Sequence, residues 1–303
     1  MLSILCRVPA DRSARRPLKG VAGALVLGAG AVAYSLYEAR RPSLARIEVP
    51  VARGPEMTIL HIADTHMSRR MAHLVEWLKR LPDVMGSIPD LIIGTGDFIE
   101  DDAGISPFLS AVSQLDARIG KYYVFGSHDY YQSRFKSLTR YFSDRHDMPT
   151  VLADTQRLEV GLDRLGWISL LNRDCVAQVD GKNVRLSGVD DPYIRRHQIE
   201  QIRRDPSDDL AIGIMHAPDL VSPWSLNHYD LILAGHTHGG QIRLPRFGAL
   251  VTNSTLPAHL AMGLHRVGSA WLYVSPGLGT SRYAPIRFLA RPKATLLQVT
   301  RVD

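Results

Sequence analysis

The pattern of apolar and polar residues predicts strands that alternate with helices in the first half of the chain. Short apolar runs typical of buried strands occur at residues 57–63, 91–93 and 121–125. Stretches with helical spacing of apolar residues lie between or after them, at 68–81, 105–119 and 131–142. Strands that are joined through helices pair in parallel, so this half indicates an α/β fold.

The second half has consecutive short strands, which indicates an antiparallel portion. We expect strands at 167–171, 175–179, 183–186, 210–215, 231–233, 271–274 and 294–299, and a helical stretch at 194–204. Asp180-Gly181 is a typical hairpin turn between the second and third of these strands.

Five of the predicted strands end in a cluster of polar residues on their carboxyl side. The clusters are Asp64 with His66, Asp97, Ser127-His128-Asp129, His216, and His236 with His238. A lone aspartate after a strand is usually a cap or turn residue, and a lone histidine usually packs. Five clusters on one edge are better explained by a ligand site, because ligands bind at the carboxyl ends of strands in open α/β sheets.

The histidines in Gly235-His236-Thr237-His238-Gly239-Gly240-Gln241 are spaced at i and i+2. Alternate residues of an extended chain point the same way. We therefore expect the two rings to converge on one point or to straddle two adjacent points. The flanking glycines allow a sharp turn and a close approach.

The candidate ligands offer oxygen and imidazole nitrogen without a thiolate, which suits Mn, Fe, Zn, Ni or Co. They are more numerous than one metal needs, so we expect two divalent metal ions bridged by one carboxylate. Asp97, preceded by Gly96, is the expected bridge. Two metals about 3.5–4 Å apart lower the pKa of a water toward about 7 and favour in-line phosphate-ester hydrolysis.

The ordered motifs D-x-H, G-D, G-x-H-D, H and G-H-x-H, over roughly residues 57–240, resemble the calcineurin-like metallophosphoesterase superfamily. The segment 235–241, with Gly277-Leu278-Gly279-Thr280 and Pro285-Ile286-Arg287-Phe288, is similar to its exported or membrane-anchored bacterial branch. The resemblance implies a four-layer α/β/β/α sandwich of two mixed sheets.

The resemblance also implies roles for the clustered residues. One metal would be held by Asp64, His66, Asp97 and His238, and the second by Asp97, His216 and His236. His128 would contact the phosphate and protonate the leaving oxygen, and Asp129 would orient and charge that imidazole.

Ser127 departs from the family pattern, which has an asparagine ligand of the second metal at this position. A serine hydroxyl is shorter and a poorer donor, so we expect it to ligate through a water or not at all. The sequence therefore predicts a weaker second metal site.

Two further residues are candidates for substrate binding. Arg287 could bind a phosphoryl group, as could Arg282, although a structural ion pair is the commoner fate of such a residue. Asp190, followed by Asp191, ends a strand and could line the mouth of the site or form a turn. His61 lies inside a strand and is expected to be a packing residue.

The first hypothesis is a dinuclear phosphohydrolase that cleaves a phosphodiester or pyrophosphate bond with metal-activated water. A lipid-linked or envelope-derived substrate would suit a membrane anchor. A degenerate, non-catalytic metal- or phosphate-binding scaffold is the alternative that Ser127 favours, and His128-Asp129 argues against it. A protein phosphatase is a third hypothesis.

The amino-terminal region predicts an anchor or an export signal. Residues 1–19 are basic, and residues 20–37 carry no charge. At about 1.5 Å per residue they match a hydrocarbon core of about 30 Å. The basic flank predicts a single-pass membrane protein with its domain outside the cytoplasm. A cleaved signal with Ala31-Val32-Ala33 as its site, a twin-arginine signal at Arg15-Arg16, and a helix packed on the domain are the alternatives.

Residues 38–56 are expected to be a connector that leads into an edge strand around 47–49, followed by one domain at 57–303. The net charge of +6 lies mostly in residues 1–37, so nucleic-acid binding by the folded domain is not expected. Two cysteines, Cys6 and Cys175, exclude a disulfide framework. The sequence assigns no oligomeric state.

Overall fold

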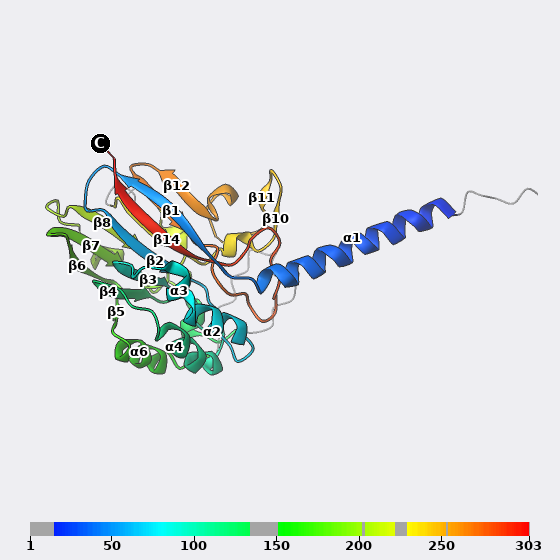
Figure 1. The fold of residues 1–303 in the computed structure, drawn as a ribbon, viewed down its shortest axis with the longest axis horizontal. Helices are drawn as coiled ribbons and strands as arrows, with labels where there is room; N and C mark the ends of the chain where they lie inside the picture. The colour runs from blue at the N-terminus through cyan, green and yellow to red at the C-terminus, as the bar shows by residue number, and fades with distance from the viewer. Residues whose placement is uncertain (1–14, 134–150, 202–203, 222–228, 253, 303) are drawn as a thin grey trace, which may run out of the picture.

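Two six-stranded mixed sheets pack face to face in the computed structural model, which describes residues 15–133, 151–201, 204–221, 229–252 and 254–302 (Figure 1). The first sheet has the order β1 (Ser43–Val51), β14 (Lys293–Arg301), β2 (Met57–Ile62), β3 (Leu91–Thr95), β4 (Gly120–Val124) and β5 (Trp167–Ser169). The second has the order β12 (Gly263–Val267), β13 (Ala270–Val274), β9 (Leu231–Ala234), β8 (Leu210–Ile214), β7 (Lys182–Gly188) and β6 (Arg173–Val179). The predicted α/β class with two mixed sheets is confirmed.

Parallel pairs form the centre of each sheet. β2, β3, β4 and β5 are parallel to one another, and so are β7, β8, β9 and β13. β14 runs antiparallel to β2, and β6 and β12 run antiparallel at the two edges of the second sheet. The turn at Asp180-Gly181 joins β6 to β7 with both φ angles positive, as the sequence predicted. The carboxyl ends of the central strands therefore meet at one end of the molecule.

The main core lies between the sheets, and a second core lies under the helices. Strand β3 shows the alternation: Leu91 and Ile93 pack between the sheets, whereas Ile92 packs on the helical side. The helices α2 (Ala72–Lys79), α3 (Leu81–Met85), α4 (Ile105–Val112) and α6 (Thr155–Arg164) cover that side of the first sheet (Figure 1). The helices expected at 68–81 and 105–119 are thus shorter than predicted, and most of that expected at 131–142 lies outside the described residues.

The outer face of the second sheet carries a smaller apolar cluster. Ile232 and Leu272 lie in it, and Leu220 packs against it. Two 3-10 helices contribute to it, η3 (Ile199–Gln201) through Ile199 and η4 (Pro218–Leu220) through Leu220. A further 3-10 helix, η6 (Ala258–Leu260), contacts β11 (Gly248–Ala249). The helical stretch expected at 194–204 is limited to η3 in the described part.

The first edge strand is longer than the sequence indicated. β1 pairs with β14 over nine residue pairs, from Ser43 with Lys293 to Val51 with Arg301. The connector expected at 38–56 therefore contains a complete strand of the first sheet, and the folded body begins by Ser43.

Helix α1 (Arg15–Ala39) packs on the body through its last turns and then projects away from it (Figure 1). Ser35 accepts a hydrogen bond from the Arg287 backbone N–H at 3.0 Å, and Glu38 accepts one from Leu289 at 2.7 Å. In the part of the chain that the structure describes, no helix is both long enough and apolar enough to span a membrane. The anchor or signal at residues 20–37 stays a prediction.

Candidate metal centre

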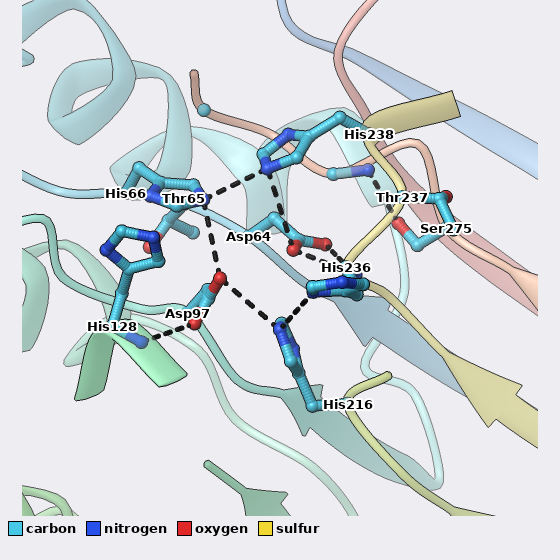
Figure 2. A network of polar contacts seen from close by, with 12 residues as sticks. Asp64, Thr65, His66, Asp97, His128, His216, His236, Thr237, His238 and Ser275 are labelled. Atoms are coloured by element: carbon cyan, nitrogen blue, oxygen red, sulfur yellow. Dashed lines mark hydrogen bonds and ion pairs between the residues drawn. The ribbon is translucent and has the colours of Figure 1, made fainter. Parts of the chain in front are cut away.

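The loops after β2, β3, β4, β8 and β9 converge at the end of the molecule where the carboxyl edges of both sheets meet. Figure 2 shows six side chains from these loops pointing toward one another: Asp64, His66, Asp97, His216, His236 and His238. Backbone hydrogen bonds tie the loops together, from Asp64 N to Gly96 O at 2.9 Å and from Gly235 N to His216 O at 2.9 Å. The site is therefore built jointly by the two sheets.

Five of the six residues have a left-handed backbone, with φ of 49° at Asp64, 41° at His66, 49° at Asp97, 70° at His236 and 51° at His238. Residues other than glycine rarely adopt this conformation, and the strain it costs is typically found where side chains serve a function. The sharp turns direct these side chains inward from the ends of the strands.

The His-x-His segment is not extended, contrary to our expectation. Thr237 has a right-handed helical conformation, and His238 begins the 3-10 helix η5 (His238–Gly240). The two rings therefore reach different ligand groups, which is the arrangement in which they straddle two adjacent points. The positive φ angles on both sides of Thr237 produce this geometry.

The first ligand group consists of Asp64, His66 and His238, whose ligand atoms lie within 4.8 Å of one another. Nε2 of His238 is 3.0 Å from Nε2 of His66 and 3.9 Å from Oδ1 of Asp64. All three side chains are buried or nearly so.

The second ligand group consists of Asp97, His216 and His236. Nε2 of His216 is 3.3 Å from Oδ2 of Asp97 and 3.2 Å from Nδ1 of His236. The same Oδ2 of Asp97 lies 3.7 Å from Nε2 of His66 in the first group. Asp97 therefore stands between the two groups, in the position of a bridging carboxylate.

The two ligand groups fit divalent cations. In each group two imidazole nitrogens face each other at close range, and their lone pairs repel unless a proton or a metal ion lies between them. Nδ1 of His216 lies 2.7 Å from the Thr95 carbonyl, which fixes its N–H there and leaves the Nε2 lone pair for a ligand. The donor set of carboxylate oxygen and imidazole nitrogen suits Mn, Fe, Zn, Ni or Co.

Glu100 supports the first group and was missed by the sequence analysis. Its Oε2 lies 2.8 Å from Nδ1 of His66, and its Oε1 accepts a hydrogen bond from the Arg282 backbone N–H at 2.9 Å. Burial disfavours both charges, but the contact between them raises the pKa of His66 to about 9 and lowers the pKa of Glu100 to about 2. A glutamate three residues after Asp97 in a loop carries no pattern that could have identified it.

Arg287 lies behind the site rather than at its mouth. It is fully buried, and its guanidinium donates to the carbonyls of Pro276 at 2.5 Å and Gly279 at 2.5 Å. Its Nη2 also lies 3.1 Å from Nδ1 of His238. The residue predicted to bind substrate is thus placed where it holds a candidate metal ligand.

His128 lies beside the first group and is half-buried. Its ring stands edge-on to that of His66, with centroids 4.8 Å apart, and its Nδ1 lies 2.8 Å from the hydroxyl of Ser133. Its backbone N–H donates to Oδ1 of Asp97 at 2.8 Å, which orients that carboxylate. Its ring also forms a candidate ligand group with His66 and Asp97. Its predicted role as general acid stays a prediction.

Asp129 is fully buried and accepts three backbone hydrogen bonds, from Gly126 at 2.9 Å, Phe98 at 2.8 Å and Ile99 at 3.3 Å. These contacts join the loop after β3 to the loop after β4. Burial, with the charge of Asp97 added, raises the pKa of Asp129 to about 8. The described contacts give this carboxyl a role in loop architecture, and its predicted role toward His128 stays a prediction.

Ser127 begins the short helix α5 (Ser127–Tyr130) and is buried. The adjoining Gly126 is packed so closely that a Cβ there would lie 2.4 Å from Oδ1 of Asp97 and 2.7 Å from the ring of His216. Ser127 therefore follows a backbone position that touches the second ligand group. Whether its hydroxyl ligates stays a prediction.

Asp190 is buried against Tyr130 and Arg196. Its carboxylate accepts from the Tyr130 hydroxyl at 2.9 Å and from Nε of Arg196 at 2.9 Å. Asp191 is also buried, and its Oδ2 has no hydrogen-bond partner among the described residues. Asp190 is thus engaged in a structural network, and its predicted substrate contact stays a prediction.

Comparisons with known proteins agree with this geometry. A family model described as calcineurin-like phosphoesterase matches residues 57–240. The chain is 30% identical to the metallophosphoesterase YkuE of Bacillus subtilis over 94% of this chain and 96% of that protein. It is 26% identical to the phosphodiesterase YaeI of Escherichia coli over 80% of this chain and 81% of that protein. It is 25% identical to a transmembrane protein with a metallophosphoesterase domain from Bos taurus, over 95% of this chain and 64% of that protein.

Proposed function

The chain belongs to the calcineurin-like phosphoesterase family and is a metal-dependent phosphoester hydrolase, and on that premise we propose that it cleaves a phosphodiester or pyrophosphate bond at a dinuclear centre. When bound, two divalent metal ions supply an activated water and neutralise charge on the phosphoryl oxygens. Asp64, His66 and His238 would hold one ion, His216 and His236 the other, and Asp97 both.

The position of Asp97 Oδ2 carries this proposal. It lies 3.7 Å from Nε2 of His66 and 3.3 Å from Nε2 of His216, so one carboxylate oxygen faces both ligand groups. Its other oxygen, Oδ1, accepts the His128 N–H, which fixes the rotation of the carboxylate. A bridge of this kind is what a two-metal hydrolase requires.

His128 is proposed as the general acid. Ser133 engages Nδ1 of its ring, so we assign the proton transfer to Nε2. The oxygen of a water that has given one proton to solvent bonds to phosphorus while the bond to the leaving oxygen breaks, and the His128 proton passes to that leaving oxygen. The half-exposed position of the ring beside the buried ligands suits a group that meets the substrate at the mouth.

Hydrolysis of bis-p-nitrophenyl phosphate by the full chain in detergent, with added Mn²⁺, tests the dinuclear proposal. The full chain is needed because a cut near residue 50 would remove most of β1. We expect turnover with close to two metals per chain, and loss of both turnover and metal in Asp97→Asn. One retained metal without turnover in the wild type would instead support the non-catalytic scaffold.

The proposed general acid is tested by leaving groups of different basicity. p-Nitrophenolate leaves without help, whereas an alkoxide needs a proton. We expect His128→Asn to slow cleavage of an alkyl phosphodiester by about 100-fold more than that of a p-nitrophenyl ester. Equal losses on both substrates would contradict the assignment and point to phosphate binding alone.

We also propose that residues 20–37 anchor the protein in a membrane, with the domain outside the cytoplasm, and that the substrate is lipid-linked or envelope-derived. The uncharged stretch and its basic flank support the anchor. So do the projection of α1 from the body and the similarity to the bovine protein, which is named as a transmembrane protein. Protease protection of an amino-terminal tag in sealed membranes, with digestion of the domain from outside, is the expected result.

A further inference from the structure

A long segment between Asp230 and the final residue, Asp303, is free of acidic residues. Residues 231–302 contain no aspartate or glutamate, and their eight basic residues are Arg243, Arg246, Arg266, Arg282, Arg287, Arg291, Lys293 and Arg301. Only Arg287 of these is fully buried. The exposed part of this segment therefore presents a positive field to its surroundings.

Within this segment, the hairpin of β10 (Arg243–Leu244) and β11 (Gly248–Ala249) exposes apolar side chains to water. Phe247 is 80% exposed, Leu250 is 56% exposed and Leu244 is 40% exposed. Arg246, in the same turn, is exposed as well. A cluster of exposed apolar residues with basic neighbours is typical of a surface that contacts a membrane interface or a partner.

The hairpin is joined to the end of helix α1. Arg243 N donates to Phe288 O at 2.9 Å, and the Phe288 ring packs edge-on against Tyr34 of α1, with centroids 5.4 Å apart. Figure 1 shows the β10–β11 hairpin beside the base of α1, on the side of the body from which the helix projects. Leu289, 43% exposed, lies in the same connection.

Further basic residues surround the base of the helix. Arg40 and Arg41 follow α1 and are exposed, and Nε of exposed Arg291 donates to the Arg41 carbonyl at 2.9 Å. Glu38 is the nearest acidic residue in the helix, and it is buried against the Leu289 N–H. Aromatic, aliphatic and arginine side chains thus gather at one face without an exposed carboxylate from the segments that form it.

We propose that the β10–β11 hairpin, with Phe247 at its turn and Arg246 beside it, docks onto an anionic lipid surface. Phe247 and Leu250 would enter the interfacial region, and Arg246, Arg40, Arg41 and Arg291 would meet lipid phosphates. Charge complementarity and continuity with α1 favour a bilayer over a second copy of the chain, because a second copy would bring the same positive charge to the contact.

Docking in this orientation places the metal centre next to lipid headgroups. His238 is only five residues before Arg243, the first residue of the hairpin, and Nη1 of Arg243 donates to the Gly239 carbonyl at 3.0 Å within η5. The docking surface does not depend on whether the protein is a hydrolase. Docking would favour a phosphodiester in a lipid headgroup as the substrate, and this consequence rests on the proposed function.

Site-specific fluorescence on the full chain tests the docking. Phe247→Cys, with Cys6 and Cys175 replaced by serine, would carry an environment-sensitive label in vesicles of phosphatidylcholine with or without phosphatidylglycerol. The matched control is Val176→Cys, since Val176 is 42% exposed on β6, away from α1 in Figure 1. We expect a blue shift and quenching by brominated lipid at position 247, stronger with phosphatidylglycerol, and neither at 176.

A label at 247 that stays as water-exposed as the label at 176 would overturn the proposal. A blue shift that appears in lipid-free detergent as protein concentration rises would also overturn it and assign the face to a second copy. Separately, Phe247→Asp with Arg246→Glu should lower hydrolysis of a vesicle-borne phosphodiester roughly tenfold and leave soluble bis-p-nitrophenyl phosphate unaffected. If the wild type hydrolyses neither substrate, the proposed function is wrong, but the fluorescence result still tests the docking proposal.

Discussion

Nη2 of Arg287 lies 3.1 Å from Nδ1 of His238, so a fully buried guanidinium holds the ring of a candidate metal ligand. Burial lowers the pKa of Arg287 to about 10, and the group therefore still carries its charge at neutral pH. The same guanidinium donates to the carbonyls of Pro276, Gly279 and Ala290. One side chain thus fixes the loop after β13 and the imidazole that faces it.

Replacing Arg287 with lysine should weaken the first metal site. A lysine ammonium cannot reproduce the planar fork that reaches three carbonyls and the ring together. We expect metal affinity to fall by about 10–100-fold, as is typical when a residue that orients a ligand is lost. Calorimetric titration with Mn²⁺ measures it. Arg266→Lys, at an exposed arginine over the Trp271 ring, is the matched control, and equal affinities in the two variants would contradict the assignment.

The positions of the ligands were predictable because each depends on local pattern. An apolar run followed by a polar residue marks a strand end, and parallel strands bring their carboxyl ends to the same edge. This reasoning located Asp64, Asp97 and His216 without knowledge of their contacts. It also anticipated a bridge at Asp97, because a glycine before it allows close approach.

Side-chain roles that depend on long-range contacts were not predictable. Arg287 looked like a phosphate ligand because an isolated arginine in a loop carries no sign of its burial. Glu100 looked like an ordinary loop residue, although its carboxylate meets His66. The left-handed backbone at His236 and His238 has no signature in residue type, so the spacing suggested an extended segment instead.

Replacing Glu100 with glutamine should weaken metal binding and change how the metal-free protein responds to pH. The contact with Glu100 raises the pKa of His66 to about 9, above the usual value of 6.5. In the metal-free protein the charged pair therefore stabilises the fold fully between about pH 4.5 and pH 6.5, and this contribution is lost as pH rises through about 9. Glu100→Gln should reduce that loss and lower metal affinity by about 10–100-fold.

Chemical denaturation of the metal-free protein at pH 6.5 and 9.5, with NMR titration of the His66 ring, checks this prediction. Asp101→Asn is the matched control, because the neighbouring carboxylate pairs with Arg282 and not with a ligand. An unchanged His66 titration in Glu100→Gln would show that the carboxylate does not control the imidazole.

Replacing Ser127 with asparagine should strengthen the second metal site. A carboxamide oxygen reaches farther than a hydroxyl and is a better neutral donor, and position 127 follows a glycine packed against Asp97 and His216. We expect metal content to approach two per chain at a free Mn²⁺ concentration about tenfold lower than in the wild type, because one ligand is added. Ser127→Ala tests whether the serine hydroxyl is a metal ligand. Metal affinity equal to that of the wild type would mean that the hydroxyl does not ligate, and weaker metal binding would mean that it does.

His61 should make the protein sensitive to acid independently of the metal centre. It is fully buried in β2, its Nε2 contacts the Thr95 hydroxyl at 2.9 Å, and its Nδ1 has no partner among the described residues. Burial lowers its pKa to about 3. Below pH 6.5 the imidazole of His61 is therefore protonated in the unfolded chain but stays neutral in the folded protein. The stability that this residue contributes is present above pH 6.5 and is lost as pH falls toward 3. The loss between pH 7 and pH 5 should be about 2 kcal/mol.

Denaturant unfolding with chelator present at both pH values isolates this effect from metal release. His61→Gln should be less stable at pH 7, because it packs less well against the Tyr273 ring, but it should lose less stability between pH 7 and pH 5 than the wild type. His259→Gln, at an exposed histidine in η6, should keep the wild-type slope. If His61→Gln keeps that slope as well, His61 is not the source of the acid sensitivity. Removing this imidazole removes the proton that the unfolded chain takes up at position 61, so an effect of His61 must change the slope.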